Sequence, residues 1–271
     1  MAAPQHGARG ESVLPESTAF NGGTAVFDRI VNIAHRGASG TRPENTLVAF
    51  RRAREIGADY VELDIRATAD GVAVVMHDGT VDRTTDGVGP VSELTLAQVK
   101  SLDAGAWFAP EYAGERVPTL AEAVALTGAG MPLSLEIKAA GVEEQAVAAI
   151  RGSGNADSFI SSFDEGCLRR VRELDPQMPI ELIVGIGPLR SDEIDALIAR
   201  ARGLGVQILA VSYGGVTPEL VAATSAAGLG LVCWTVDDRD DMQRMLDLGV
   251  RAITTNHPEV LQELLGRPVG E

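Results

Sequence analysis

The fold of this chain is decided by two neighbouring stretches, YVELDI at residues 60–65 and VAVVMHD at residues 72–78. Both are rich in the β-branched and other apolar residues typical of strands, and the Asp70-Gly71 pair between them is a strong signal for a two-residue hairpin turn. With that turn, His77 lies directly opposite Asp64. Opposed residues of an antiparallel pair point to the same face of the sheet. We therefore expect an imidazole and a carboxylate side by side.

A second carboxylate, Glu62, lies two positions before Asp64 and is expected to share its face. Two carboxylates beside an imidazole are suited to hold a divalent cation next to a proton-transfer group. The alternative is a half-buried strand whose polar residues face solvent, because alternation of polar and apolar residues is typical of any exposed sheet face. The rest of the chain decides between these interpretations.

Outward from the hairpin, the sequence alternates strand-like apolar runs with amphipathic helical patterns. We treat the hairpin strand that carries His77 as an excursion, that is, as lying outside the barrel. The strands expected in the barrel are then residues 31–34, 60–65, 133–138, 159–162, 180–184, 207–212, 229–236 and 252–255. Eight parallel strands with intervening helices predict an α/β fold, a (β/α)8 TIM barrel, with its chemistry at the carboxyl ends of the strands. If the strand that carries His77 were counted as part of the barrel, the number of strands would be nine instead of eight.

Two segments fall outside this alternation. Residues 1–28 are rich in Gly, Ala, Pro and Ser, which predicts a flexible N-terminal extension. Residues 79–117 contain a polar glycine-rich run, a short helical pattern and three aromatic residues, and are too long for an ordinary loop. We expect them to form a small cap inserted after the His77 hairpin, within a single catalytic domain that covers residues 29–271.

Composition narrows the class of protein. A chain of 271 residues with 45% apolar residues can form one large domain with a substantial core. The formal charge of −15 disfavours nucleic acid and anionic lipid surfaces as partners. We expect no membrane span, because no run of about 18 apolar residues occurs. Cys167 and Cys233 give no disulfide or zinc spacing, which favours a cytoplasmic location. A homo-oligomer remains open.

Polar and aromatic side chains gather at the predicted carboxyl ends of the strands. They are His35, Arg36, Glu62, Asp64, His77, Glu136, Lys138, Ser162, Phe163, Trp234 and Asn256. Two histidines, three carboxylates and two cations on one rim are more than random placement would give. The rim therefore favours a functional interpretation of the hairpin carboxylates.

The chain resembles the glycerophosphodiester phosphodiesterase family through a set of short motifs in the family's order. The motifs are His35-Arg36-Gly37, Pro43-Glu44-Asn45-Thr46, Glu62-x-Asp64, Asp70 to Asp78, Arg83-Thr84-Thr85, Asp103-Ala104-Gly105, Pro118-Thr119-Leu120, Leu135-Glu136-Ile137-Lys138, Ser161-Ser162-Phe163 and Trp234-Thr235-Val236. Each motif is weak alone, but the ordered set is specific and spans residues 32–258. One departure is Asn256, where the family often has an acidic residue.

The resemblance implies metal-dependent hydrolysis of small-molecule glycerophosphodiesters to sn-glycerol 3-phosphate and an alcohol. It implies that Glu62, Asp64 and Glu136 hold one divalent cation, Ca²⁺ or Mg²⁺, and that His35 and His77 act as acid and base. Three oxygen donors leave positions for substrate oxygens on a hard cation. Two imidazoles suit proton transfer near neutral pH.

Other rim residues are expected to bind substrate. Arg36 and Lys138 would neutralise the phosphate oxygens, and Glu44 would orient Arg36. Phe163 and Trp234 would form a wall on the glycerol or alcohol side of the site.

The residues permit attack at phosphorus by the substrate's own glycerol 2-hydroxyl, through a cyclic phosphate, or direct attack by water. Two other functions also remain open. One is a phosphodiesterase acting on a lysophospholipid or phosphoinositide, against which the acidic charge and the missing membrane signal count. The other is a non-catalytic barrel that binds a phosphorylated ligand, which the presence of both histidines and all three carboxylates disfavours.

Overall fold

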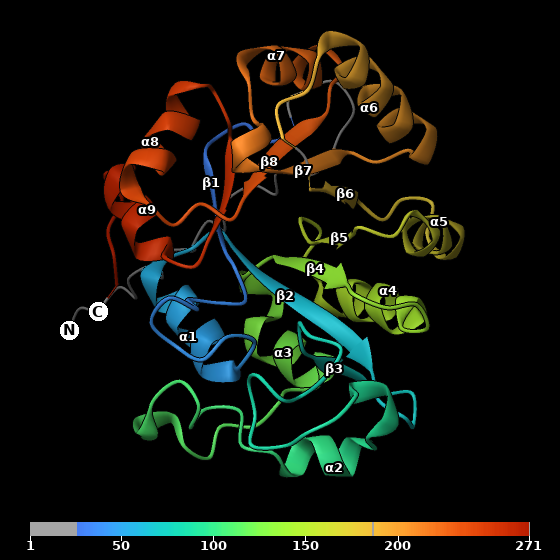
Figure 1. Cartoon of the computed structure of the whole chain (residues 1–271), viewed down its shortest axis with the longest axis vertical. Helices are drawn as coiled ribbons and strands as arrows, with labels where there is room; N and C mark the ends of the chain where they lie inside the picture. Colours follow the sequence, from blue (N-terminus) through green and yellow to red (C-terminus); the bar gives the residue numbers. More distant parts are fainter. Residues whose placement is uncertain (1–25, 186, 271) are drawn as a thin grey trace, which may run out of the picture.

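Parallel strands close into a ring in this protein, whose computed structural model describes residues 26–185 and 187–270 (Figure 1). Around the ring the order is β1 (Val31–Ala34), β9 (Ala252–Thr255), β8 (Gly230–Trp234), β7 (Ile208–Ser212), β6 (Ile180–Val184), β5 (Phe159–Ser162), β4 (Leu133–Ile137) and β2 (Tyr60–Ala67). Strand β1 pairs in parallel with both β9 and β2, which closes the ring. The predicted TIM barrel is confirmed. Residues 1–25 of the predicted extension lie outside the described ranges.

Helices follow the strands along the chain and surround the ring (Figure 1). They are α1 (Leu47–Ile56), α3 (Leu120–Thr127), α4 (Glu143–Ser153), α5 (Glu165–Leu174), α6 (Ser191–Leu204), α7 (Pro218–Ala226), α8 (Arg239–Asp247) and α9 (Pro258–Leu264). The sequence sets their ends through local hydrogen bonds. In α1, the Thr46 side chain accepts from the Ala49 amide and Gly57 ends the helix at φ +84°, a conformation that glycine adopts without steric cost.

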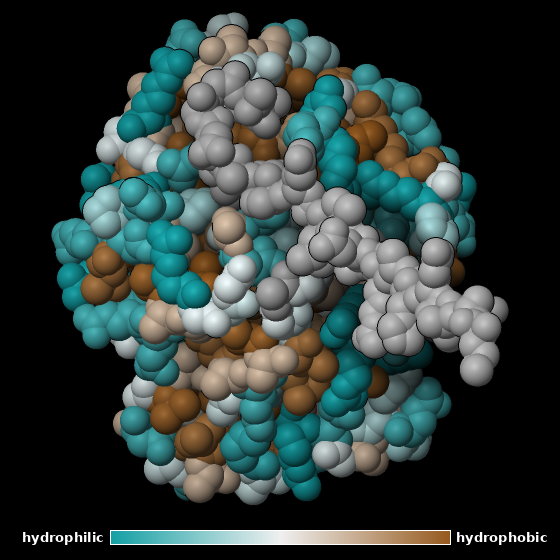
Figure 2. Space-filling view, turned by 180° about the vertical axis from the view of Figure 1, so that it is seen from behind, coloured by the Kyte–Doolittle hydropathy of each residue, from teal (hydrophilic) through white to brown (hydrophobic). Residues whose placement is uncertain are grey.

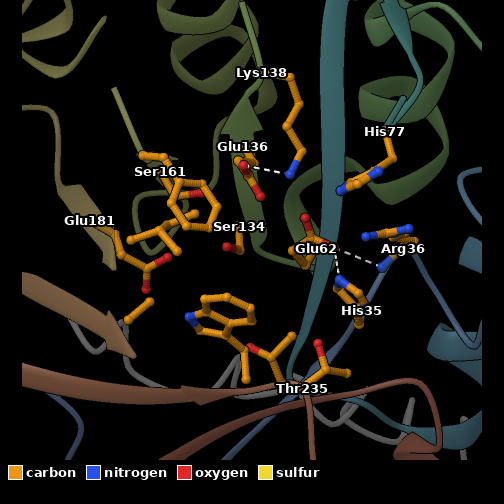
Figure 3. A pocket seen from close by; sticks show the side chains of 15 residues that line it. His35, Arg36, Glu62, His77, Ser134, Glu136, Lys138, Ser161, Glu181 and Thr235 are labelled. Atoms are coloured by element: carbon orange, nitrogen blue, oxygen red, sulfur yellow. Dashed lines mark hydrogen bonds and ion pairs between the residues drawn. The ribbon is translucent and has the colours of Figure 1, made fainter. Parts of the chain in front are cut away.

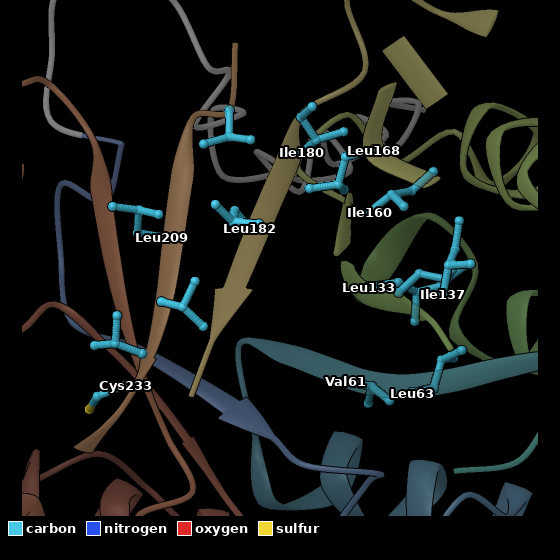
Figure 4. Close-up of a cluster of buried hydrophobic side chains, with 14 of the residues drawn as sticks. Val61, Leu63, Leu133, Ile137, Ile160, Leu168, Ile180, Leu182, Leu209 and Cys233 are labelled. Atoms are coloured by element: carbon cyan, nitrogen blue, oxygen red, sulfur yellow. The ribbon is translucent and has the colours of Figure 1, made fainter. Parts of the chain in front are cut away.

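The core has two layers, because alternate residues of each strand face the helices or the inside of the ring. Figure 4 shows the layer between strands and helices, with Val61, Leu63 and Leu133 among its members. Inside the ring, Phe27 and Phe159 belong to a second buried cluster of apolar side chains. The inner positions nearer the carboxyl ends carry polar groups instead, and the site lies there.

Strand β3 (Ala73–Val75) pairs antiparallel with β2 outside the closed ring, as the excursion predicted from sequence, but its register differs from the prediction. Ile65 pairs with Val75, and the Met76 amide donates to the Asp64 carbonyl at 2.9 Å, so Met76 rather than His77 lies opposite Asp64. A one-residue slip in register moves a side chain to the other face.

The turn explains the slip. The Thr68 amide donates to the Val72 carbonyl at 3.0 Å, which leaves three residues rather than two in the turn. Asp70 Oδ1 accepts from both the Thr68 hydroxyl and the Leu96 amide, and Gly71 takes φ +77°. A three-residue turn with glycine in the left-handed region is the next most common hairpin connection. His77 follows the end of β3, so the sheet does not fix the direction of its side chain.

Residues 79–117 lie beside β2 and β3, away from the ring, and include α2 (Leu96–Ser101) with the short 3₁₀ helices η1 (Val91–Glu93) and η2 (Pro110–Tyr112) (Figure 1). They have an apolar cluster of their own with β3, formed by Val74, Met76, Val81, Val91, Val99, Ala104 and Val117. The Phe108 ring packs edge to face with both Trp107 and Tyr112. The interpretation of residues 79–117 as a functional cap remains a prediction.

The visible surface is mainly hydrophilic. From the side opposite to Figure 1, teal side chains follow much of the outline, with smaller brown groups between them (Figure 2). Among the helices of residues 26–185 and 187–270, none combines the length and apolar composition that a membrane span requires.

Candidate active site

A cavity of about 120 Å³ opens where the carboxyl ends of the strands meet. The predicted site residues in its lining are His35, Arg36, Glu62, His77, Glu136, Lys138, Phe163 and Trp234. Of the other two predicted residues, Asp64 is fully buried next to them and Glu44 binds Arg36. Ring closure thus brings together residues that are far apart in sequence.

Glu62, Asp64 and Glu136 form a buried acidic trio whose ligand atoms all lie within 4.8 Å of one another. Their proximity follows from strand pairing. Asp64 of β2 is in register with Glu136 of β4, and Glu62 lies two residues earlier on the same face of β2. A separation of this size lets one ion contact all three groups.

The oxygens of the trio fit a divalent cation. Glu62 Oε1 is buried without a hydrogen-bond partner among the described residues. Asp64 Oδ1 and Glu136 Oε1 form ion pairs with Lys138 Nζ at 3.1 and 2.6 Å, but make no hydrogen bond. Buried charges are costly unless they are paired or coordinate a metal. An all-oxygen donor set suits a hard cation, so the trio could hold a metal ion.

The pKa shifts of the trio describe the same imbalance of charge. Burial, together with the neighbouring carboxylates, raises the pKa of Glu62 well above its usual range. Burial and the Asp64 charge raise the pKa of Glu136 to about 7. Burial also raises the pKa of Asp64, but Lys138 and Arg36 outweigh it and hold that pKa below its usual value. Two of the three carboxyls therefore lack enough positive charge nearby.

Arg36 connects the trio to the loop after β1. Its backbone takes φ +55°, and its amide donates to Glu62 Oε2 at 2.7 Å. Its guanidinium donates to Glu44 Oε1 at 2.8 Å and lies 3.3 Å from Asp64 Oδ2. Positive φ is uncommon for a residue with a side chain and is often found at functional sites. Glu44 thus contacts Arg36 as the sequence suggested.

Asn45 has a role in the site that the sequence did not predict. Thr46, not Asn45, is the N-cap residue of α1. Asn45 also takes positive φ, at +57°, and its side-chain amide donates to Asp64 Oδ2 at 2.7 Å. The signal in the sequence was an asparagine directly before the N-cap residue, because Asn tolerates positive φ better than most residues.

The His35 imidazole is oriented by Asn256 of the loop after β9. His35 Nδ1 lies 2.7 Å from Asn256 Oδ1, and Asn256 Nδ2 donates to Asp237 Oδ2 at 2.7 Å. An amide oxygen only accepts, so Nδ1 carries the proton and Nε2 is left as the acceptor. Burial and the Arg36 cation lower the pKa of His35 from 6.5 to about 4. An amide side chain, itself held by Asp237, thus orients this histidine.

The His77 imidazole is oriented by its neighbour in sequence. His77 Nδ1 donates to Asp78 Oδ1 at 2.6 Å. Arg83 donates to the same Asp78 carboxylate at 2.7 Å and to both oxygens of Glu44 at 2.8 Å. Burial is the largest cause that lowers the pKa of His77. Asp78 and Arg83, which were not among the predicted site residues, thus link the His77 and Arg36 sides of the site.

In Figure 3, Glu181 and Ser161 lie on the side of the pocket opposite His35 and His77. Phe163 and Trp234 pack edge to face with ring centroids 5.7 Å apart, and Lys138 Nζ lies 5.7 Å from the Phe163 centroid. Glu181 of β6 also points toward the cavity. It was missed because its strand, IELIV, has the composition of an ordinary buried strand. A glutamate at an inward position of such a strand was the available signal.

Comparison with known proteins agrees with this geometry. Residues 35–260 match the glycerophosphoryl diester phosphodiesterase family. The chain belongs to this family. A glycerophosphodiester phosphodiesterase of Caldanaerobacter subterraneus subsp. tengcongensis is 41% identical over 240 residues, covering 86% of this chain and 96% of the relative. One of Bacillus subtilis is 35% identical over 274 residues, covering 93% of this chain and 92% of the relative.

A solved structure is also similar to this family member. It is an Oleispira antarctica phosphodiesterase in complex with the product sn-glycerol-3-phosphate, with a TM-score of 0.78 and 31% sequence identity. The match covers 88% of this chain and 97% of that chain. The family and its named relatives place this protein among the phosphoric diester hydrolases, as a glycerophosphodiester phosphodiesterase.

Proposed function

We propose that this phosphodiesterase hydrolyses glycerophosphodiesters to sn-glycerol 3-phosphate and an alcohol by histidine acid and base catalysis. The observation that carries the proposal is the acidic trio, whose ligand atoms lie within 4.8 Å of one another in a cavity that both His35 and His77 line. The complex of the Oleispira antarctica phosphodiesterase with sn-glycerol-3-phosphate supports the choice of product.

Glu62, Asp64 and Glu136 would hold one divalent cation, Ca²⁺ or Mg²⁺. The burial of all three carboxylates, with one lysine shared between Asp64 and Glu136 and no hydrogen-bond partner for Glu62 Oε1 among the described residues, supports this assignment. When bound, the cation would polarise a phosphoryl oxygen and neutralise charge that develops on it. Arg36 and Lys138, which line the same cavity, would stabilise the remaining phosphate charge.

The two imidazoles would move the protons. One would take the proton of the glycerol 2-hydroxyl as its oxygen bonds to phosphorus, and the other would protonate the alcohol oxygen as its bond to phosphorus breaks. Water would then open the cyclic phosphate, with the two proton transfers reversed. Each Nδ1 is anchored, His35 to Asn256 and His77 to Asp78, which leaves each Nε2 for this transfer. Phe163 and Trp234 would enclose the alcohol or glycerol part of the substrate.

Two features outside the cavity belong to the same proposal. Residues 79–117 would act as a cap on the site, and Arg83, through its bonds to Glu44 and Asp78, is their connection to it. Cys167 and Cys233 are free and buried, which fits a reducing, cytoplasmic location.

A direct test compares glycerophosphocholine with the corresponding lysophosphatidylcholine, each with Mg²⁺ or Ca²⁺, and measures release of sn-glycerol 3-phosphate or of lysophosphatidic acid. We expect glycerophosphocholine to be the better substrate by at least about 10-fold in kcat/KM, because a cavity of about 120 Å³ is too small to enclose an acyl chain. Asp64→Asn, which keeps the shape of the side chain, should be inactive with both. Preference for the lysolipid, or no hydrolysis of any glycerophosphodiester, would overturn the proposal.

A further inference from the structure

One buried acid in the cavity has no part in the chemistry described so far. Glu181 is only 4% exposed, and its Oε2 has no hydrogen-bond partner among the described residues. The indole Nε1 of Trp234, which lines the same cavity, is likewise buried without a partner. Buried polar groups in native proteins are rarely left unsatisfied, because each costs roughly 1–3 kcal/mol. Two such groups in one cavity point to a ligand that supplies their partners.

Among the described residues, no side chain forms an ion pair with Glu181 or a hydrogen bond with its Oε2. Ile183, two residues along β6, and Ala210 of β7 line the cavity next to it and are apolar, and Ser161 of β5, in register with Glu181, adds a hydroxyl group but no charge. Burial raises the pKa of Glu181 to about 8, which agrees with a carboxyl group that no cation balances. An acid held in this way can bond the hydroxyl groups of a neutral ligand without competing for the metal or the phosphate.

The position of Glu181 relative to the metal trio sets the size of that ligand. Glu136 is in register with Ser161, and Ser161 with Glu181, so two strand spacings separate the backbones of the two glutamates. Neighbouring strands lie about 4.8 Å apart, which puts these backbones roughly 10 Å from each other. Figure 3 shows Glu181 across the pocket from His35, Arg36 and His77, with Ser134 between.

The space between these groups suits a short polyol. The cavity measures about 120 Å³. An engineered cavity of roughly 150 Å³ is enough for benzene, so this one can enclose a three-carbon unit but not an acyl chain. A phosphate at the acidic trio would leave its glycerol group directed across the cavity toward Glu181.

We propose that Glu181 binds the terminal hydroxyl of the glycerol unit and that the Trp234 indole N–H donates to an oxygen of the same unit. This inference rests on the proposed function. It assigns one side of the cavity to the glycerol that becomes sn-glycerol 3-phosphate, and leaves the released alcohol at the open side. With the terminal hydroxyl held, the 2-hydroxyl is positioned at phosphorus. The site would then select glycerol over alcohols that lack the terminal hydroxyl.

The test compares glycerophosphocholine with its propane-1,2-diol analogue, which keeps the attacking hydroxyl and lacks only the terminal one. Wild-type enzyme with Mg²⁺ should prefer glycerophosphocholine by about 10²-fold or more in kcat/KM, because a site built to bond a hydroxyl is left with unpaired polar groups when the hydroxyl is missing. Glu181→Leu should lower that preference to a few-fold by slowing glycerophosphocholine and leaving the analogue nearly unchanged. Ile183→Val, which changes the same cavity without a polar group, should keep the preference.

Binding of the two products gives a second readout that does not depend on turnover. By calorimetry, sn-glycerol 3-phosphate should bind the wild-type enzyme more tightly than propane-1,2-diol 1-phosphate, and Glu181→Leu should remove the difference. Should Glu181→Leu fail to fold, Glu181→Gln serves for the same comparison, since an amide retains an acceptor but not the acid and should lose part of the preference.

The outcomes separate the two proposals. Equal losses on both substrates in a folded Glu181 variant, or an unchanged preference, would overturn the assignment of Glu181 while the hydrolase function stands. Failure of wild-type enzyme to release sn-glycerol 3-phosphate from any glycerophosphodiester would instead overturn the proposed function.

Discussion

The two halves of the cavity differ in how their charges are balanced. On the side of β1, β2 and β4, the acidic trio, Arg36 and Lys138 form a network in which both cations contact carboxylates. On the side of β6, β7 and β8, Glu181 lies among Ile183, Ala210 and Trp234, and no cation within the described part of the chain forms an ion pair with it. The same fold thus supplies a highly charged half and a nearly neutral half.

This difference in charge suggests that one half of the cavity acts on the phosphate and the other half selects the substrate. Charged groups held close together in a buried site act strongly on phosphate and on a cation, because the local dielectric is low. A half with few charges selects a substrate by shape and by single hydrogen bonds. Changes to the charged half should therefore affect the rate most, and changes to the other half should affect preference and stability.

Removal of divalent cations should have the largest effect. Excess EDTA is expected to lower release of sn-glycerol 3-phosphate by about 10³-fold or more, because metal polarisation of a phosphoryl oxygen supplies several kcal/mol of transition-state stabilisation. Added Mg²⁺ or Ca²⁺ should restore the rate and raise the Tm of wild-type protein, but not that of Asp64→Asn. Full activity in EDTA would contradict the role given to the charged half, since that half would then act without a cation.

Loss of either imidazole should have the next largest effect. His35→Ala and His77→Ala are each expected to lower kcat by about 10²-fold or more, because each group transfers a proton in the transition state. The matched control is His257→Ala, since His257 bonds Glu259 and does not line the cavity. Near-wild-type turnover of either His35→Ala or His77→Ala would remove that residue from the mechanism.

Protonation of Glu181 should make the free energy of unfolding depend on pH. Its folded pKa of about 8 lies above the ordinary value of 4.5, so between these pH values the folded state binds more protons than the unfolded state. The stabilising contribution of protonation is therefore present at low pH and lost as pH rises through 8. Between pH 6 and 9 in EDTA, we expect the free energy of unfolding to fall by about 2–3 kcal/mol more in wild-type protein than in Glu181→Gln, because each of the two pH units between 6 and 8 contributes about 1.4 kcal/mol.

Urea unfolding at several pH values measures this difference. Because both proteins share every other titrating group, subtraction isolates Glu181. Parallel curves for the two proteins would show that Glu181 titrates normally and would weaken the contrast between the two halves.

Arg83 should have the smallest effect. Its side chain is 45% exposed, and exposed ion pairs contribute less than about 1 kcal/mol, so Arg83→Ala is expected to lower kcat about 5-fold or less through looser positioning of His77. Arg190→Ala is the control, because Arg190 is an exposed arginine with acidic neighbours outside the cavity. A loss as large as that of His77→Ala would instead place Arg83 in contact with the reacting groups.

The ring of strands and the charged half were largely predictable from the sequence. Alternation of apolar runs and helical patterns is a local property, and eight such units leave few folds to consider. Glu62, Glu136 and His35 could be placed together because parallel strands end on one rim. Their roles in catalysis remain proposals.

The register of the β2–β3 hairpin was not predictable in the same way. The turn depends on Asp70 binding the Leu96 amide, a contact with a segment that the local sequence does not specify. The position of Asn45 on Asp64 depends similarly on the fold around it. Long-range contacts of this kind decide between turn types that local propensity leaves nearly equal in energy.

The amino-acid sequence by itself determined the barrel and which chemical groups stand at its rim, because hydrogen-bond periodicity and strand direction are encoded locally. The tertiary structure was needed to show that Glu181 faces the acidic trio across a small cavity, with its Oε2 unbonded to any described residue. That arrangement depends on how the closed ring sets the distances between strands, and no stretch of the chain contains this information.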